Sequence, residues 1–118
     1  MKGKYRFEAQ QALMDIADHL IFPVAERLLK DKLSLIDYQI EQIELDKRDD
    51  EKPLLHFLFG NREMLLGNFR KAENFFLQSL QFDPEYLLAS EKLSELYVNH
   101  LDQEEKAEPF LAKLKDKS

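Results

Sequence analysis

The chain has 118 residues, a formal net charge of −6 at pH 7 and 44% hydrophobic residues. That length suits one small domain, and the apolar content is sufficient for a hydrophobic core. The negative charge argues against nucleic acid as the main partner, because phosphate binding requires a positive surface. Cysteine is absent from the sequence, which excludes disulfides and thiolate metal ligands and is compatible with a reducing cytoplasm.

The amino-terminal residues lack the continuous apolar stretch of a signal peptide. The longest apolar-rich run without a charged residue, residues 53–60, is far shorter than the ~20 residues that span a bilayer. We therefore expect a soluble, cytoplasmic protein without membrane insertion.

Apolar residues recur at three- and four-residue spacing along most of the chain, which is typical of amphipathic helices. The spacing predicts helices over residues 4–21, 23–48, 53–66, 69–82, 85–99 and 104–115. Pro23 either ends the first helix or opens the second, and Ser34 could start a new helix within residues 23–48. Since no segment alternates apolar and polar residues for long enough to predict a strand, the expected fold class is all-α.

Charged and turn-forming residues separate the predicted helices. The run DKRDDEKP, residues 46–53, has the charge and the terminal proline of an exposed connection. Later breaks are predicted at Gly67–Asn68, at Asp83–Pro84 and within residues 99–103. These short turns divide the second half of the chain into pairs of helices.

Residues 53–84 carry a characteristic set of small, aromatic and turn-forming residues. Gly60 and Ala72 are small enough for two helices to approach closely, and Phe76 can fill the remaining space between them. Gly67 can close the turn in a left-handed conformation, and Pro84 suits the start of the next helix. This stretch resembles the tetratricopeptide repeat family, whose unit is a helix pair of about 34 residues.

A weaker copy of the same pattern follows over residues 87–115. Its first helix has matching positions at Ser90, Leu93, Ser94 and Tyr97. Ala107 and Leu111 then repeat the alanine-x-x-x-phenylalanine spacing one residue late. The sequence departs from the family where tryptophan is preferred, because His56 and Ser90 stand there. The resemblance covers residues 53–115 and implies two tetratricopeptide-like helical hairpins.

Residues 4–48 lie outside the resemblance. Because about three repeats are needed to bury the faces of a repeat array, we expect these N-terminal helices to pack as a cap or a degenerate repeat. They could equally form a dimerisation segment, since a second subunit can also cover the open end of an array. We expect residues 1–118 to form a single domain, with residues 4–48 preceding the two hairpins.

The sequence contains no recognisable catalytic, metal or cofactor motif. The serines lack a Gly-x-Ser-x-Gly nucleophile motif, and neither Gly60 nor Gly67 leads into the Lys-Ser or Lys-Thr of a phosphate-binding loop. Asp15 and His19 have the spacing of neighbours on a helix, and we interpret them as a solvated pair and not as a metal site. We therefore expect a protein that is not an enzyme and needs no cofactor.

The resemblance implies a peptide-binding groove, because the first helix of each tetratricopeptide repeat lines the concave surface that holds a partner. The corresponding positions are Leu54, Phe57, Asn61, Met64, Leu88, Glu91 and Glu95. Family members that bind a terminal carboxylate have a lysine where Phe57 stands, and neutral or basic groups at Glu91 and Glu95. A carboxylate would be repelled here, so we expect an apolar segment with one or two positive charges.

Two functions of different class follow from this surface. The first is an adaptor or small chaperone that holds an apolar, basic segment of another protein. The alternative is a structural assembly subunit, such as a homodimer, whose apolar surface is permanently covered. The helix over residues 53–66 is apolar on nearly every side, so residues 4–48 could instead cover Leu54 and Phe57 within the chain.

Overall fold

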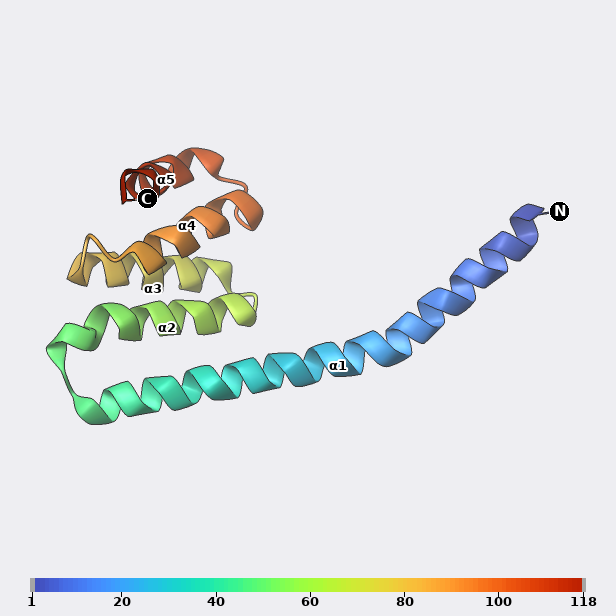
Figure 1. The fold of residues 1–118 in the computed structure, drawn as a ribbon, viewed down its shortest axis with the longest axis horizontal. Coiled ribbons are helices and arrows are strands. Elements are labelled where there is room, and N and C mark those ends of the chain that lie inside the picture. Colours follow the sequence, from blue (N-terminus) through green and yellow to red (C-terminus); the bar gives the residue numbers. More distant parts are fainter. Residues whose placement is uncertain (1, 118) are drawn as a thin grey trace. The chain divides into compact units, whose positions relative to one another are not determined.

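The computed structural model describes the backbone of residues 2–117 and the side chains of residues 24–116. Its elements in chain order are α1 (Lys2–Asp46), the short 3-10 helix η1 (Asp49–Glu51), α2 (Lys52–Leu65), α3 (Phe69–Phe82), α4 (Leu87–Asn99) and α5 (Glu104–Lys117) (Figure 1). Within residues 2–117 there is no strand, so the predicted all-α class is confirmed.

The four C-terminal helices lie close to their predicted positions. α3 covers residues 69–82 as predicted, and α2 is displaced by one residue from the predicted 53–66. α4 starts two residues later than predicted because Asp83 organises a turn before it. The Glu85 amide donates to Asp83 Oδ1 at 3.0 Å, and the Tyr86 amide donates to the Asp83 carbonyl at 3.1 Å. Pro84 therefore lies in this turn and not in the first turn of α4.

The prediction of separate helices over residues 4–21 and 23–48 is wrong, because the single helix α1 continues through Pro23 and Ser34. A proline removes one backbone hydrogen bond but does not force a helix to end when the freed carbonyl can bond elsewhere. The chain divides within α1 into two compact units, Met1–Ser34 and Leu35–Ser118. The amphipathic face predicted for residues 4–21 lies outside the described side chains.

The core of the second unit lies between α2, α3, α4 and α5. Its completely buried members are Ala72, Phe76, Ala89, Leu93, Leu96 and Ala107. The part of α1 after Ser34 also contributes, because Ile40 is buried and both Ile36 and Ile43 pack against the same cluster. An ion pair of 2.8 Å between Arg62 Nε and Asp37 Oδ1 joins α2 to this part of α1. One side of α2 is therefore covered by the chain itself.

The first hairpin, α2 with α3, depends on two glycines in different ways. A Cβ atom added to Gly60 would lie 2.5 Å from Cε1 of the completely buried Phe76, so only glycine allows this contact. Gly67 has a φ of +81°, the left-handed conformation predicted for the turn. Its amide donates to the carbonyl of Met64 at 3.0 Å, which closes the end of α2. Both roles predicted for these glycines are confirmed.

In the second hairpin, α4 with α5, the predicted pairing of Ala107 with Leu111 is wrong. Ala107 is buried as expected, but Leu111 is 48% exposed. Phe110 faces inward instead, and its ring stacks on Tyr97 with 6.1 Å between centroids. Residues three and four positions apart share a face of a helix, so spacing alone does not decide which of the two packs inward. The larger aromatic ring takes that place.

Tyr97 also connects α4 to α3 through a polar contact. Its hydroxyl donates to Glu73 Oε2 at 2.7 Å, and the residue as a whole is buried. The pKa of Tyr97 is raised above its ordinary value of 10.0, because burial disfavours the phenolate. The neighbouring Glu73 carboxylate is the second cause and acts in the same direction.

This raised pKa predicts a loss of stability in alkaline solution. The folded pKa lies above the unfolded value, so the contribution of Tyr97 is fully present below about pH 10 and is lost as the pH rises through the folded pKa. We expect the free energy of unfolding, measured in urea from about pH 8 to about pH 11, to fall more steeply in the parent than in Tyr97→Phe. Tyr38→Phe changes an exposed tyrosine and should keep the parental slope. Equal slopes in the parent and Tyr97→Phe would contradict this account.

Candidate functional site

The predicted groove position at Phe57 is part of the core. The side chain is only 8% exposed, and its ring centroid lies 5.9 Å from that of Phe76 and 5.9 Å from that of Tyr86. Phe57 therefore packs against α3 and the start of α4, and it is not available to a partner in this structure. Because α2 is apolar on nearly every side, its sequence does not show which apolar residues will be covered.

The other predicted positions on α2 are half-buried: Leu54, Asn61 and Met64. Leu54 lines a shallow hollow together with Leu58 of α2 and with residues of α1, namely Tyr38, Gln39, Gln42 and Ile43. Leu54 thus lies next to the part of α1 in the second unit, as one of the alternatives drawn from the sequence allows. Phe57, by contrast, is covered by Phe76 and Tyr86.

The predicted positions on α4 are more accessible. Leu88 and Glu91 are exposed, and Glu95 is half-buried in an ion pair of 3.4 Å with Lys92 Nζ. Val98, which is 40% exposed, continues their spacing of three, four and three residues. Residues at this spacing lie on one face of a helix. The outer face of α4 therefore extends from Leu88 to Val98, and the series 88, 91 and 95 could have identified Val98 from the sequence.

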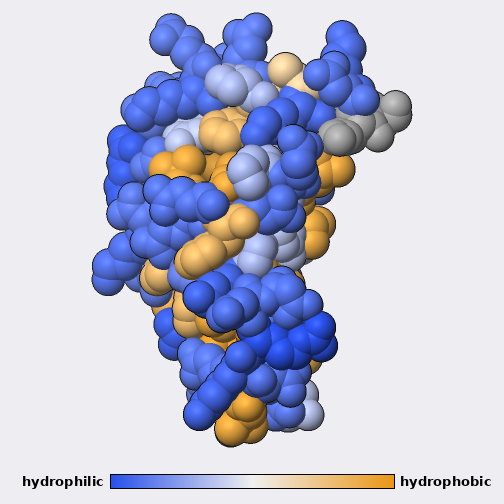
Figure 2. Space-filling view, turned by 90° about the vertical axis from the view of Figure 1, so that its left-hand side faces the viewer, coloured by the Kyte–Doolittle hydropathy of each residue, from blue (hydrophilic) through white to orange (hydrophobic). Residues whose placement is uncertain are grey.

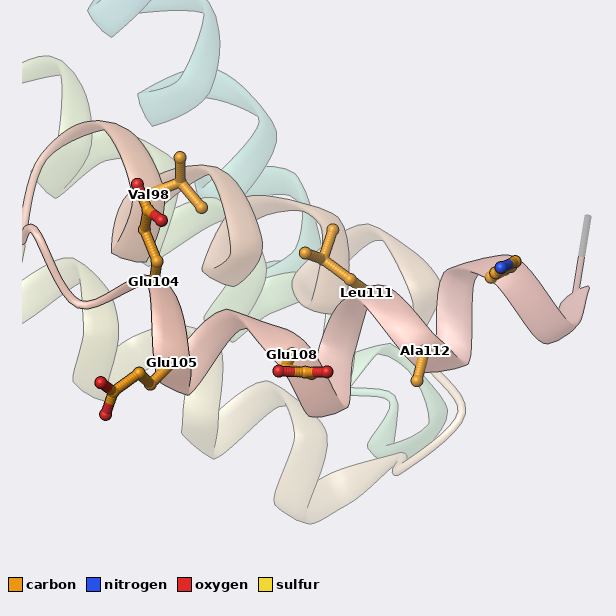
Figure 3. A pocket seen from close by; sticks show the side chains of 7 residues that line it. Val98, Glu104, Glu105, Glu108, Leu111 and Ala112 are labelled. Atoms are coloured by element: carbon orange, nitrogen blue, oxygen red, sulfur yellow. The ribbon is translucent and has the colours of Figure 1, made fainter.

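At Val98 this face meets an open hollow of about 720 Å³ between α4 and α5 (Figure 3). The hollow is lined by Val98, Glu104, Glu105, Glu108, Leu111, Ala112 and Lys115. Val98, Leu111 and Ala112 supply the apolar surface, whereas three carboxylates and one ammonium group supply the charge. Figure 3 shows Val98 on α4 and the other labelled residues along α5. We refer to these seven residues as the α4–α5 hollow.

Local sequence explains how α5 comes to line this hollow. Glu104 and Glu105 occupy the first turn of α5, where negative side chains interact favourably with the amino-terminal end of a helix. Glu108 follows Glu104 by one turn and so lies on the same side. Leu111 is free to face outward because Phe110 takes the inward position. None of the three glutamates forms an ion pair with another side chain among the described residues 24–116.

The α4–α5 hollow offers both charged and apolar side chains. Its carboxylates can accept hydrogen bonds from a cation, and its apolar residues can pack against an apolar side chain. Across the described residues, no group of three or more histidine, aspartate or glutamate side chains could hold a metal ion. On the face seen in Figure 2, hydrophobic side chains lie exposed among hydrophilic ones.

In comparisons with known proteins, no family model, no curated protein and no solved structure matches the chain. Over the part of the chain that the structure describes, none of the helices combines the length and apolar character needed to cross a bilayer.

Proposed function

We propose that this protein is a tetratricopeptide-like interaction module, an adaptor or small chaperone, that binds an apolar and positively charged segment of another protein. The observation that carries the proposal is the α4–α5 hollow, where accessible apolar residues are bordered by three glutamates and a single lysine. Such a surface attracts lysine or arginine and repels acidic segments.

The resemblance to the repeat family is supported by contacts at the positions the repeat would require. Gly60 packs against Phe76, and Gly67 adopts the left-handed conformation at the turn. The accessible positions of the implied groove, Leu88 and Glu91, lie on the same helix as Val98. A bound segment could therefore extend from the α4–α5 hollow along the outer face of α4.

The expected affinity follows from the size of the apolar contact. One or two large side chains packed against Val98 and Leu111 would contribute about 1.5–3 kcal/mol each, before the cost of ordering the segment. Exposed charge pairs with Glu104, Glu105 and Glu108 would add about 0.2–1 kcal/mol each and would weaken with salt. We therefore expect micromolar dissociation constants that rise with ionic strength.

Two synthetic peptides of equal length, one of alternating leucine and lysine and one of alternating leucine and glutamate, would test this expectation. We expect fluorescence anisotropy to show binding of the cationic peptide only. Neutralising the rim with Glu104→Gln, Glu105→Gln and Glu108→Gln should weaken binding about tenfold at low salt, as expected for three exposed charge pairs. The matched control neutralises three exposed acidic residues on α1, with Glu26→Gln, Glu44→Gln and Asp46→Asn.

A second variant tests the apolar part of the same surface. Val98→Ser with Leu111→Ser changes two exposed side chains and should leave helicity by circular dichroism unchanged. It should weaken binding of the cationic peptide by more than tenfold at every salt concentration, because apolar contacts are not screened. Equal binding of both peptides, or equal losses in the rim variant and its control, would contradict the proposed site.

A further inference from the structure

The connection between α1 and α2 is held by very little packing. Every residue from 44 to 50 is exposed. The chain leaves α1 at Asp46 and enters η1 at Asp49, and η1 has no buried residue. Lys47 has a φ of +54°, which is uncommon for a residue other than glycine, and Arg48 has an extended backbone with φ −93° and ψ 130°. This connection can therefore open without disturbing the core.

The same connection carries two adjacent basic residues. The sequence has two such pairs, Lys47 with Arg48 and Arg70 with Lys71. Among the residues whose side chains are described, Lys47 and Arg48 are the only lysine or arginine residues outside a helix. Arg48 Nη2 lies 2.7 Å from Asp50 Oδ2, and both side chains of this ion pair are largely exposed. Exposed pairs contribute little, so this contact does not prevent Arg48 from entering the active site of another protein.

We propose that the peptide bond between Arg48 and Asp49 is a processing site, which an endoprotease specific for basic residues cuts in the folded protein. The reaction is hydrolysis of the C–N bond. Water adds across this bond, so that Arg48 gains a carboxyl group and Asp49 gains an amino group. Cleavage of a folded protein requires local opening of the chain, and its rate follows the population of the open form. Exposed, weakly packed residues on both sides of the bond favour that opening.

The second basic pair has a different environment. Arg70 and Lys71 lie in the first turn of α3, and the next residue, Ala72, is completely buried. Arg70 Nη1 also donates to Gln103 Oε1 at 3.1 Å. Presenting the bond after Lys71 to a protease therefore requires α3 to lose contacts with the core, whereas opening around Arg48 does not. The structure thus distinguishes two pairs that look alike in the sequence.

Cleavage after Arg48 would separate α1 from residues 49–118, which contain the whole of the α4–α5 hollow. The part of α1 in the second unit contacts the core through three isoleucines, and one ion pair joins its Asp37 to Arg62. Stable interfaces use about 20–30 residues from each partner, so these few contacts should not hold a free fragment. Loss of the fragment would uncover the side of α2 that carries Leu54.

Initial rates of trypsin cleavage on the full chain, resolved by mass spectrometry for each bond, would test the site. Synthetic peptides of residues 44–52 and 67–75 give the rate of each bond without a fold. After division by these rates, we expect cleavage after Arg48 to be faster than cleavage after Lys71 by about a hundredfold or more. Equal normalised rates, or a faster cut after Lys71, overturn the proposal.

Two matched variants and a mass measurement complete the test. Lys47→Gln with Arg48→Gln should prevent release of residues 49–118, whereas Arg70→Gln with Lys71→Gln should release them at the parental rate. Light scattering on the cut parent at about 10 μM should show two species, each smaller than the intact 14.0 kDa chain. A cut protein that keeps the mass of the intact chain overturns the release of α1.

Discussion

Replacing Phe76 by alanine is expected to lower the free energy of unfolding by about 3–5 kcal/mol, the range for removing a large aromatic side chain from a core. Phe76 has no exposed surface, and it contacts both Gly60 and the ring of Phe57. Its removal would leave a cavity between α2 and α3 that neighbouring side chains can fill only partly. Since small domains are stable by about 5–15 kcal/mol, this loss would bring the protein close to unfolding.

Urea titration followed by circular dichroism would measure the effect. The matched control is Phe82→Ala, because Phe82 ends the same helix and is 49% exposed. We expect this control to cost less than about 1.5 kcal/mol, since less of its surface is taken from water on folding. Similar losses in the two variants would mean that the hairpin does not depend on the buried ring.

Replacing Gly60 by alanine is expected to cost about 1–3 kcal/mol, the range for overpacking a core, although alanine is the better helix former. The new Cβ would lie 2.5–2.9 Å from three carbon atoms of the Phe76 ring. Because that ring is completely buried, it cannot turn into solvent to relieve the contact. The two helices must therefore separate, which weakens packing along the whole hairpin.

A double-mutant cycle would identify the cause of this loss. Phe76→Leu removes the ring that the new methyl group would meet, so Gly60→Ala should cost less in that background than in the parent. Gly67→Ala serves as a control, because the strain there arises from the positive φ of the backbone and no atom lies within 4 Å of the added Cβ. Its cost, about 1–2 kcal/mol, should be the same with phenylalanine or leucine at position 76. Additive losses for Gly60→Ala and Phe76→Leu would contradict the proposed steric origin.

Local features of the amino-acid sequence were sufficient to predict the all-α class and much of the helix pattern. The span of α3 and the turn at Gly67 follow from apolar spacing and from the conformational freedom of glycine. The close contact at Gly60 could also be predicted, because a small residue in an otherwise bulky helix marks where another helix approaches. These features depend on interactions within one or two turns of chain, and their signals are therefore present in the sequence.

The outer face of α4 was likewise within reach of the sequence, since the resemblance to the repeat family pointed to Leu88, Glu91 and Glu95, and Val98 continues their spacing. The other features of the site depend on which of several equivalent helix faces packs against another helix. Phe57 is buried because Tyr86 and Phe76 pack on its side of α2.

The sequence alone thus determined where most of the helices form, where the first hairpin turns and which residue must be small. Only the tertiary structure decided that Phe57 belongs to the core and that Phe110, not Leu111, faces inward. It also showed that Leu35, Tyr38 and Leu45 of α1 are exposed. The physical reason is that residues at three- and four-residue spacing are nearly equivalent along a helix. Their burial is settled by contacts with distant segments, which the local pattern does not encode.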